Sequence, residues 1–238
     1  MNPHLAKAGS PRALLSSLWT HRSLTYQLAK REVIGRYRGS VAGIAWSFFN
    51  PLLMLAVYTF VFSVIFKARW SGLEAGRGGF AIVLFIGVLV HGIFAECLNR
   101  APTLIMANTN YVKRVMFPLE ILPWVAMGSA LFHAFISLLV LVVAQVIVLG
   151  SIPPTALLLP LILAPLVLTT MGIAWIFAAF GVYLRDIGQI TVVITTVALF
   201  LSPVFYPVTA LPEQYRGIFL MNPLTFIIEQ AREVMIWG

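Results

Sequence analysis

The sequence predicts an all-α, polytopic membrane protein, and three observations lead to this prediction. Residues 121–184 contain no Asp, Glu, Lys or Arg, a run of 64 residues that water would not tolerate unless nearly all of it were buried. Hydrophobic residues make up 60% of the chain and charged residues 10%, whereas a soluble domain carries about 25% charged residues. Further uncharged runs lie on both sides of the central one. We therefore expect most of the chain to lie in a lipid bilayer.

Residues 1–38 are expected to form a cytoplasmic amphipathic interface segment ahead of a transmembrane domain at 39–238. Apolar side chains recur there at helical spacing, as in a helix that lies on a leaflet: Leu14, Leu15, Leu18 and Trp19. This helix either anchors the chain or flanks an entrance for a lipid-attached substrate. The segment has no continuous apolar core, so we expect no cleavable signal peptide.

Five transmembrane helices are expected from the uncharged runs. The first run, residues 39–66, has 28 residues, and the second, residues 78–95, has 18. At about 20 residues per crossing, the central run holds a hairpin of two helices that turns near Gly150 and Pro153-Pro154. The fifth run, residues 187–212, crosses once before its prolines end the helix.

The segment 217–228 has only 12 uncharged residues and contains Asn222-Pro223, so it is predicted to be a re-entrant extracytoplasmic segment. With the amino terminus in the cytoplasm, five crossings place eleven basic residues inside and five outside, as the positive-inside rule requires. The carboxyl terminus then lies outside, and we expect a sixth helix beyond Gly238.

Several residues inside the apolar runs have predicted structural roles. Gly39 and Gly43 have the small-xxx-small spacing that lets a second helix approach closely. Glu96 and Arg100 are four residues apart and are predicted to form an ion pair on one helix. Three polar residues at membrane depth are assigned to hydrogen bonds between helices: His91, His133 and Gln145.

Other functions are excluded by what the sequence lacks. The single cysteine, Cys97, cannot form an intrachain disulfide, and no Cys or His residues have metal-ligand spacing, so we expect no metal site. The net charge of +8 comes from basic residues at the ends of apolar runs, where loops and anionic lipids explain them without nucleic acid. No lysine follows a glycine, so the chain has no phosphate-binding loop for ATP. Any energy source must therefore lie in another polypeptide.

Two segments carry a resemblance to a known family. From Lys30 the chain reads KREVIGRYRGSVAGIAWSFFNPLL, and from Phe205 to Arg232 it reads FYPVTALPEQYRGIFLMNPLTFIIEQAR. Both segments resemble permease subunits of ABC-2 type transporters that export O-antigen, capsule or teichoic acid. The resemblance implies two copies of this chain, a separate ABC ATPase that binds ATP and Mg, and a lipid-linked polysaccharide substrate, with O-antigen as the first expectation. It also implies a bacterial inner (cytoplasmic) membrane protein with six helices and no enzymatic activity of its own.

Three sets of residues are candidates for this function. Arg36, Tyr37 and Arg38 are placed where a lipid pyrophosphate headgroup would enter, and arginine forks suit phosphate oxygens; lipid anchoring and charge-directed insertion are the alternatives. Contact with the ATPase is expected in the loop from about Arg100 to Pro118 and in the next cytoplasmic loop, through Asn108, Tyr111, Lys113, Arg114, Arg185 and Asp186. A solvated loop that only sets topology is the alternative for the first of these.

Aromatic side chains, 13% of the sequence, are candidates for the lining of a polysaccharide channel, because sugar rings stack on them. The candidates are Trp46 with Phe49, Tyr58 with Phe62, Phe177 with Phe180, and Phe205 with Tyr206, the last two at an external gate. Lipid-facing or core packing is the alternative for each. Two other functions stay open: an ABC-2 exporter of small hydrophobic molecules, and an ATP-independent secondary transporter or channel. The uncharged centre argues against proton coupling in the latter.

Overall fold

A computed structural model describes residues 11–66, 70, 78–112 and 117–238 of the chain. All regular structure in this described part is helical. The α-helices are α1 (Pro11–Thr20), α2 (Arg22–Tyr37), α3 (Trp46–Tyr58), α4 (Gly79–Arg100), α5 (Leu104–Ala107), α6 (Thr109–Val112), α7 (Leu122–Leu149), α8 (Leu159–Tyr183), α9 (Ile187–Phe200), α10 (Glu213–Leu220) and α11 (Pro223–Arg232). The prediction of an all-α membrane protein is confirmed.

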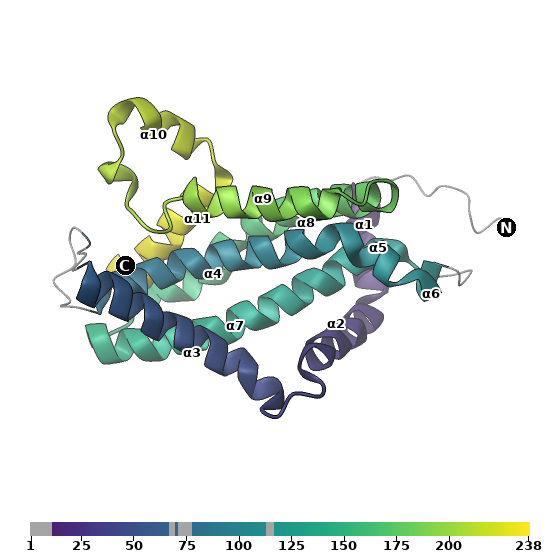
Figure 1. The fold of residues 1–238 in the computed structure, drawn as a ribbon, viewed down its shortest axis with the longest axis horizontal. Coiled ribbons are helices and arrows are strands. Elements are labelled where there is room, and N and C mark those ends of the chain that lie inside the picture. Colours follow the sequence, from purple (N-terminus) through teal and green to yellow (C-terminus); the bar gives the residue numbers. More distant parts are fainter. Residues whose placement is uncertain (1–10, 67–69, 71–77, 113–116) are drawn as a thin grey trace.

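Helix α4 is the centre of the bundle. Helices α3, α7, α8, α9 and α11 all pack against it, and the long helices run side by side in Figure 1. In its most apolar 18-residue window, 78% of the residues are buried, against 17–22% in the other three long apolar helices. The other helices therefore bury one side against α4 and leave apolar side chains on the other, as a bilayer or a second subunit allows.

Among the residues that the structure describes, four helical segments are long and apolar enough to cross a membrane: Gly43–Ile65, Gly79–Ala107, Leu119–Leu149 and Pro154–Tyr183. The last two form the predicted hairpin. Gly150 ends α7 with φ +78°, a left-handed conformation that glycine adopts without strain, and its N–H donates to the carbonyl of Val146. Pro154 then begins the helical segment that leads into α8.

The first span differs from its prediction at the start. Gly39 and Gly43 lie in the connection between α2 and α3, with φ of +86° and +54°, and no atom of the described residues lies within 4 Å of a Cβ placed on either. The prediction of a helix-packing glycine pair is therefore wrong, and these glycines serve a turn. Helix α3 continues into a π-helical segment, Thr59–Ile65.

The second helical span continues beyond the uncharged run 78–95 and includes the charged residues Glu96 and Arg100. Helix α4 ends at Arg100, and a short 3-10 turn and α5 extend the apolar helical segment to Ala107. Helix α6 follows it. Because α2 lies beside this end of the bundle, its side chains can neutralise these charges inside the structure.

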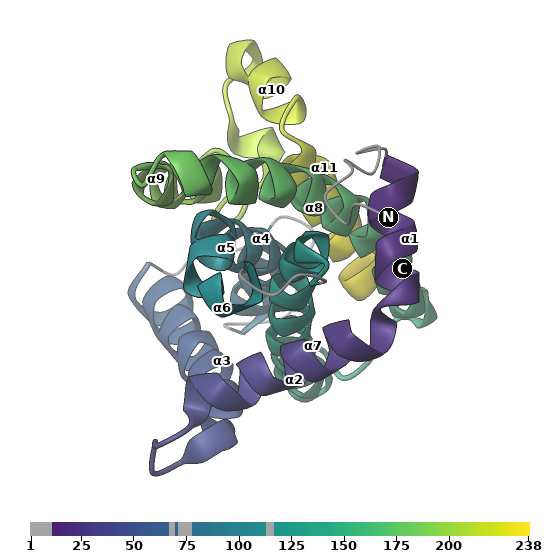
Figure 2. The same cartoon turned by 90° about the vertical axis from the view of Figure 1, so that its right-hand side faces the viewer.

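The amino-terminal segment forms two helices, α1 and α2, which meet at His21 (Figure 2). Helix α2 packs on α7, and α1 contacts the turn at Leu119–Ile121, where the Ser17 hydroxyl donates to Glu120 over 2.9 Å. The Trp19 side chain is exposed. We call the end of the bundle where α2, α5 and α6 lie the α2 end.

Beyond α8, the chain returns to the opposite end. Helix α9 has 14 residues and stops at Phe200, before the prolines, so a fifth full crossing stays a prediction. Helix α10 projects from the bundle and α11 turns back onto α4 and α8 (Figure 1). The turn is fixed by Asn222, whose side chain caps α11 by accepting from the Leu224 N–H and donates to the Leu201 carbonyl.

Candidate functional site

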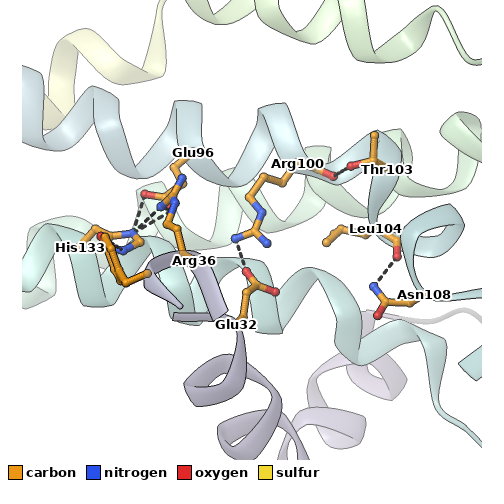
Figure 3. A network of polar contacts seen from close by, with 9 residues as sticks. Glu32, Arg36, Glu96, Arg100, Thr103, Leu104, Asn108 and His133 are labelled. Carbon is orange, nitrogen blue, oxygen red and sulfur yellow. Dashed lines mark hydrogen bonds and ion pairs between the residues drawn. The ribbon is translucent and has the colours of Figure 1, made fainter. Parts of the chain in front are cut away.

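Two ion pairs join α2 to α4 at the α2 end (Figure 3). Arg36 donates to Glu96 over 2.6 Å, and Arg100 pairs with Glu32. Glu32 and Arg36 are one helical turn apart on α2, as are Glu96 and Arg100 on α4, and on both helices the glutamate precedes the arginine. The two helices therefore hold each other in a single register. The expected ion pair between Glu96 and Arg100 on α4 is wrong, because each residue pairs with α2 instead.

The Glu32 carboxyl is partly buried in this contact. Burial raises its pKa, while the neighbouring Arg100 opposes the rise. A carboxylate held this way depends on its partner, because removing Arg100 would leave a desolvated charge without compensation.

Histidine 133 on α7 completes the cluster. Its Nδ1 lies 2.8 Å from Glu96 Oε1, and its Nε2 lies 3.0 Å from the hydroxyl of Tyr37. Arg36 Nη1 is 3.0 Å from the same Nδ1. Helices α2, α4 and α7 thus meet at one polar centre, which confirms the predicted interhelical role of His133.

A cavity of about 500 Å³ lies beside this centre, between α2, α3, α4 and α7. Its polar wall contains Arg36, Tyr37, Glu96 and His133. Its apolar wall follows α3 and α4 away from them.

The three residues predicted to contact the lipid headgroup lie in two different environments. Arg36 and Tyr37 face the polar centre and bind other helices. Arg38, the next residue, is exposed, and in the described part of the chain its side chain has no hydrogen-bond or ion-pair partner. Its guanidinium is available to an external anion.

The predicted coupling residues lie partly at the α2 end. Tyr111 stacks on Phe117 with ring centroids 4.5 Å apart, and Arg31 of α2 donates to its hydroxyl over 3.4 Å. The Asn108 amide donates to the Leu104 carbonyl over 2.8 Å, within the short helix. Lys113 and Arg114 lie outside the described residues.

The other predicted contact, Arg185 and Asp186, forms the turn between α8 and α9. The Asp186 carbonyl accepts from the N–H groups of Gln189 and Ile190, and no ion pair joins Arg185 to Asp186. This turn is exposed. Arg185 and Asp186 are therefore exposed, whereas Asn108 and Tyr111 are half-buried.

The predicted aromatic pairs have different surroundings. Trp46 and Phe49 meet edge to face at 6.4 Å on the exposed side of α3. Phe180 is exposed on α8, whereas Tyr58 and Phe177 pack against the core. The predicted pairing within helices thus holds for Trp46 with Phe49.

At the opposite end, Phe62 stacks on Phe80 at 5.4 Å and on Phe205 at 6.0 Å. The Tyr206 hydroxyl donates to the Phe200 carbonyl, and its ring meets Phe219 of α10 at 6.1 Å. The two predicted gate residues therefore connect the end of α9 to the π-helical segment Thr59–Ile65, to α4 and to α10.

A buried arginine, one of the five basic residues predicted to lie outside, holds α11 in place. Arg232 is fully buried and donates to the carbonyls of Val83, over 3.1 Å, and Val204, over 2.9 Å. It also pairs with Glu229 over 3.1 Å and lies 4.5 Å from the centroid of the Trp70 ring. No pattern in the sequence separates it from a loop arginine.

Two further polar residues confirm their predicted roles between helices. His91 on α4 lies 2.9 Å from the Thr195 carbonyl of α9, and Gln145 on α7 donates to the Met235 carbonyl beyond α11.

The sequence did not predict that Glu32 contacts α4 or that Glu96 contacts α2. Each of these glutamates is followed four residues later by an arginine. This shared charge pattern is the signal that could have predicted the pairing of α2 with α4.

Comparison with known proteins agrees with this architecture. The family described as ABC-2 type transporter matches residues 23–236. An O-antigen export system permease protein RfbA of Myxococcus xanthus is 28% identical over 224 residues, which cover 93% of this chain and 83% of the relative. A protein of the same name from Klebsiella pneumoniae is 25% identical, with 89% and 79% covered. The polysialic acid transport protein KpsM of Escherichia coli is 24% identical, with 87% and 79% covered. The chain is therefore a member of the ABC-2 type transporter family.

Proposed function

We propose that this chain is the permease subunit of an ATP-driven exporter of lipid-linked polysaccharide, with O-antigen as the first candidate, in the bacterial inner membrane. The observation that carries the proposal is the similarity, over about nine-tenths of the chain, to relatives named as permeases for O-antigen export. Two copies of the chain form the conduit, and a separate pair of ABC ATPase subunits binds ATP and Mg. The α2 end faces the cytoplasm.

The lipid pyrophosphate of the substrate meets Arg38 first. Arg38 is exposed directly beyond α2, and its guanidinium can bind phosphate oxygens in two-point geometry. Arg36 and Tyr37 support this contact by fixing the end of α2 to Glu96 and His133.

The ATPase acts on the α2 end through the segment with Asn108, Tyr111, Lys113 and Arg114, and through Arg185 and Asp186. Tyr111 supports this role because it contacts both Phe117 and Arg31 of α2. A push on this segment would therefore reach α2 and, through the ion pairs, α4.

The polymer passes along aromatic side chains, for which we propose Trp46, Phe49, Tyr58, Phe62, Phe177 and Phe180, and leaves past Phe205 and Tyr206. The exposed pair Trp46 and Phe49 supports this path, as does the contact of Phe205 and Tyr206 with four helical segments. Flat rings let a sugar chain slide because stacking does not fix one position.

Deletion of the permease in its native cell tests the proposal. Surface polysaccharide should disappear and lipid-linked polymer should accumulate inside, and the intact chain should restore export. Tyr111→Ala should keep the protein in the membrane but lower export, with Tyr183→Ala, an exposed tyrosine at the end of α8, as the control. Normal surface polysaccharide in the deletion strain would refute the proposed substrate.

A further inference from the structure

The cavity at the polar centre has a charged end and an apolar end, as a binding site for an amphiphilic molecule requires. Its charged wall lies at Glu96 and Arg36, and its wall along α4 continues through Gly92 and Leu89 to Phe85. Glu96 lies eleven positions after Phe85, a distance of about 16 Å along the helix. Pro51 and Met54 of α3 line the apolar part from the other side. The shape offers one polar end and one apolar slot, as a lipid requires.

The polar end combines both signs of charge. Arg36 uses Nη1 for its contacts with Glu96 and His133, which leaves the donors on Nε and Nη2 for another acceptor. The Glu96 carboxylate lies in the same wall, and the rings of Tyr37 and Trp46 also line the cavity. A carboxylate beside aromatic rings suits an ammonium group, and a guanidinium suits a phosphate.

The apolar slot exists because residue 92 is glycine. Within the described part of the chain, a Cβ added to Gly92 meets no atom within 4 Å, whereas one added to Gly87, one turn and a residue earlier on α4, meets Arg232 at 3.0 Å. Gly92 therefore borders open space within the bundle rather than a close helix contact. A larger side chain at this position would enter the cavity without displacing backbone.

We propose that this cavity binds a zwitterionic phospholipid of the phosphatidylethanolamine type. Its phosphate binds Arg36, its ammonium lies near Glu96, and an acyl chain follows α4 past Gly92 toward Phe85. A pyrophosphate headgroup fits less well, because its several negative charges would meet one arginine that already faces a carboxylate. The proposal concerns a membrane lipid and does not depend on which substrate the protein exports.

Lipid retention by the purified full-length permease tests this site. The protein is exposed to equal amounts of phosphatidylethanolamine and phosphatidylglycerol with the same acyl chains. The bound lipid is then identified and quantified by native mass spectrometry. We expect one tightly held phosphatidylethanolamine per chain, preferred by about tenfold, the effect of one charge-assisted hydrogen bond. Glu96→Gln should lower the ratio of bound phosphatidylethanolamine to bound phosphatidylglycerol to about one. Glu213→Gln, a fully solvated carboxylate on α10, is the matched control and should leave it unchanged.

A second pair of variants tests the slot without changing charge. Gly92→Leu should abolish the tightly held lipid, whereas Gly172→Leu, at a glycine of α8 that also borders open space, should retain it. Equal retention of the two lipids by the unmodified protein would overturn the proposal, as would full retention in Gly92→Leu. Displacement of the lipid by free inorganic pyrophosphate would also overturn it, because the polar end would then be an anion site.

Discussion

Replacing Arg232 with methionine should detach α11 from the bundle. The guanidinium is fully buried and donates to Val83, Val204 and Glu229, with the Trp70 ring against its face. Methionine keeps much of the volume but donates nothing, so the Val204 carbonyl loses its charged partner. A Cβ on Gly87 would lie 3.0 Å from this guanidinium, which shows how closely α4 surrounds it.

The expected loss follows from the hydrogen bonds. Breaking a buried, charged cluster costs about 3–5 kcal/mol, since each bond to a charged group contributes roughly 1.5–3 kcal/mol and new apolar packing offsets part of the loss. For a chain of this size, that loss in the free energy of unfolding corresponds to a fall in Tm on the order of 10 °C.

Thermal unfolding in detergent, followed by tryptophan fluorescence, measures this loss. The matched control is Arg216→Met on α10, because Arg216 also donates to two backbone carbonyls, of Leu211 and Thr209, but its side chain is 39% exposed. The control should lower Tm by only about 2 °C, as expected for an exposed contact. Equal shifts in the two variants would refute the argument that burial makes Arg232 an anchor.

Three further changes test other contacts. Gly181→Ala should lower the free energy of unfolding by more than about 2 kcal/mol, because its Cβ would overlap the Pro102 carbonyl oxygen; proteolysis at the α2 end should accelerate. Glu32→Arg or Arg100→Glu alone should destabilise by about 1–2 kcal/mol, and the double swap should recover most of it in a double-mutant cycle. Asn222→Ala should cost about 1–2 kcal/mol in thermal unfolding, since it removes a helix cap.

Controls separate these effects from general damage. Gly172→Ala lies on the same helix as Gly181 but borders open space, so it should be neutral or stabilising, and a loss equal to that of Gly181→Ala would contradict the close-contact explanation. A double charge swap no more stable than the single variants would show that the pair of Glu32 and Arg100 does not hold α2 in register. An Asn222→Ala protein with unchanged Tm would show that the cap does not hold α11.

The sequence predicted the hairpin well because its turn is encoded locally. Gly150 and the prolines at 153 and 154 prevent a continuous helix wherever they stand, and the absence of charge makes the flanking segments apolar enough to cross a membrane. The glycine pair at 39 and 43 was misjudged because the same spacing serves a helix contact and a turn. Only the positive φ angles distinguish the two.

The polar centre could be predicted only in part. Glu96 and Arg100 have the spacing of a local pair, but α2 offers each a partner of opposite charge, and the partner's position depends on the fold. Arg232 shows the same limit more strongly, because its acceptors are backbone carbonyls 28 and 149 residues away. Candidate residues on exposed helix ends, such as Arg38, are easier to find because basic residues gather there in sequence.

Transport in proteoliposomes tests the central claim, that this chain supplies a conduit driven by a separate ATPase. The permease is reconstituted with and without its ATPase, and lipid-linked polysaccharide that crosses the bilayer is measured with and without ATP. The account predicts accumulation against a gradient only when both subunits and ATP are present. Uphill movement of polysaccharide by the permease alone, under an ion gradient and without ATP, would contradict it.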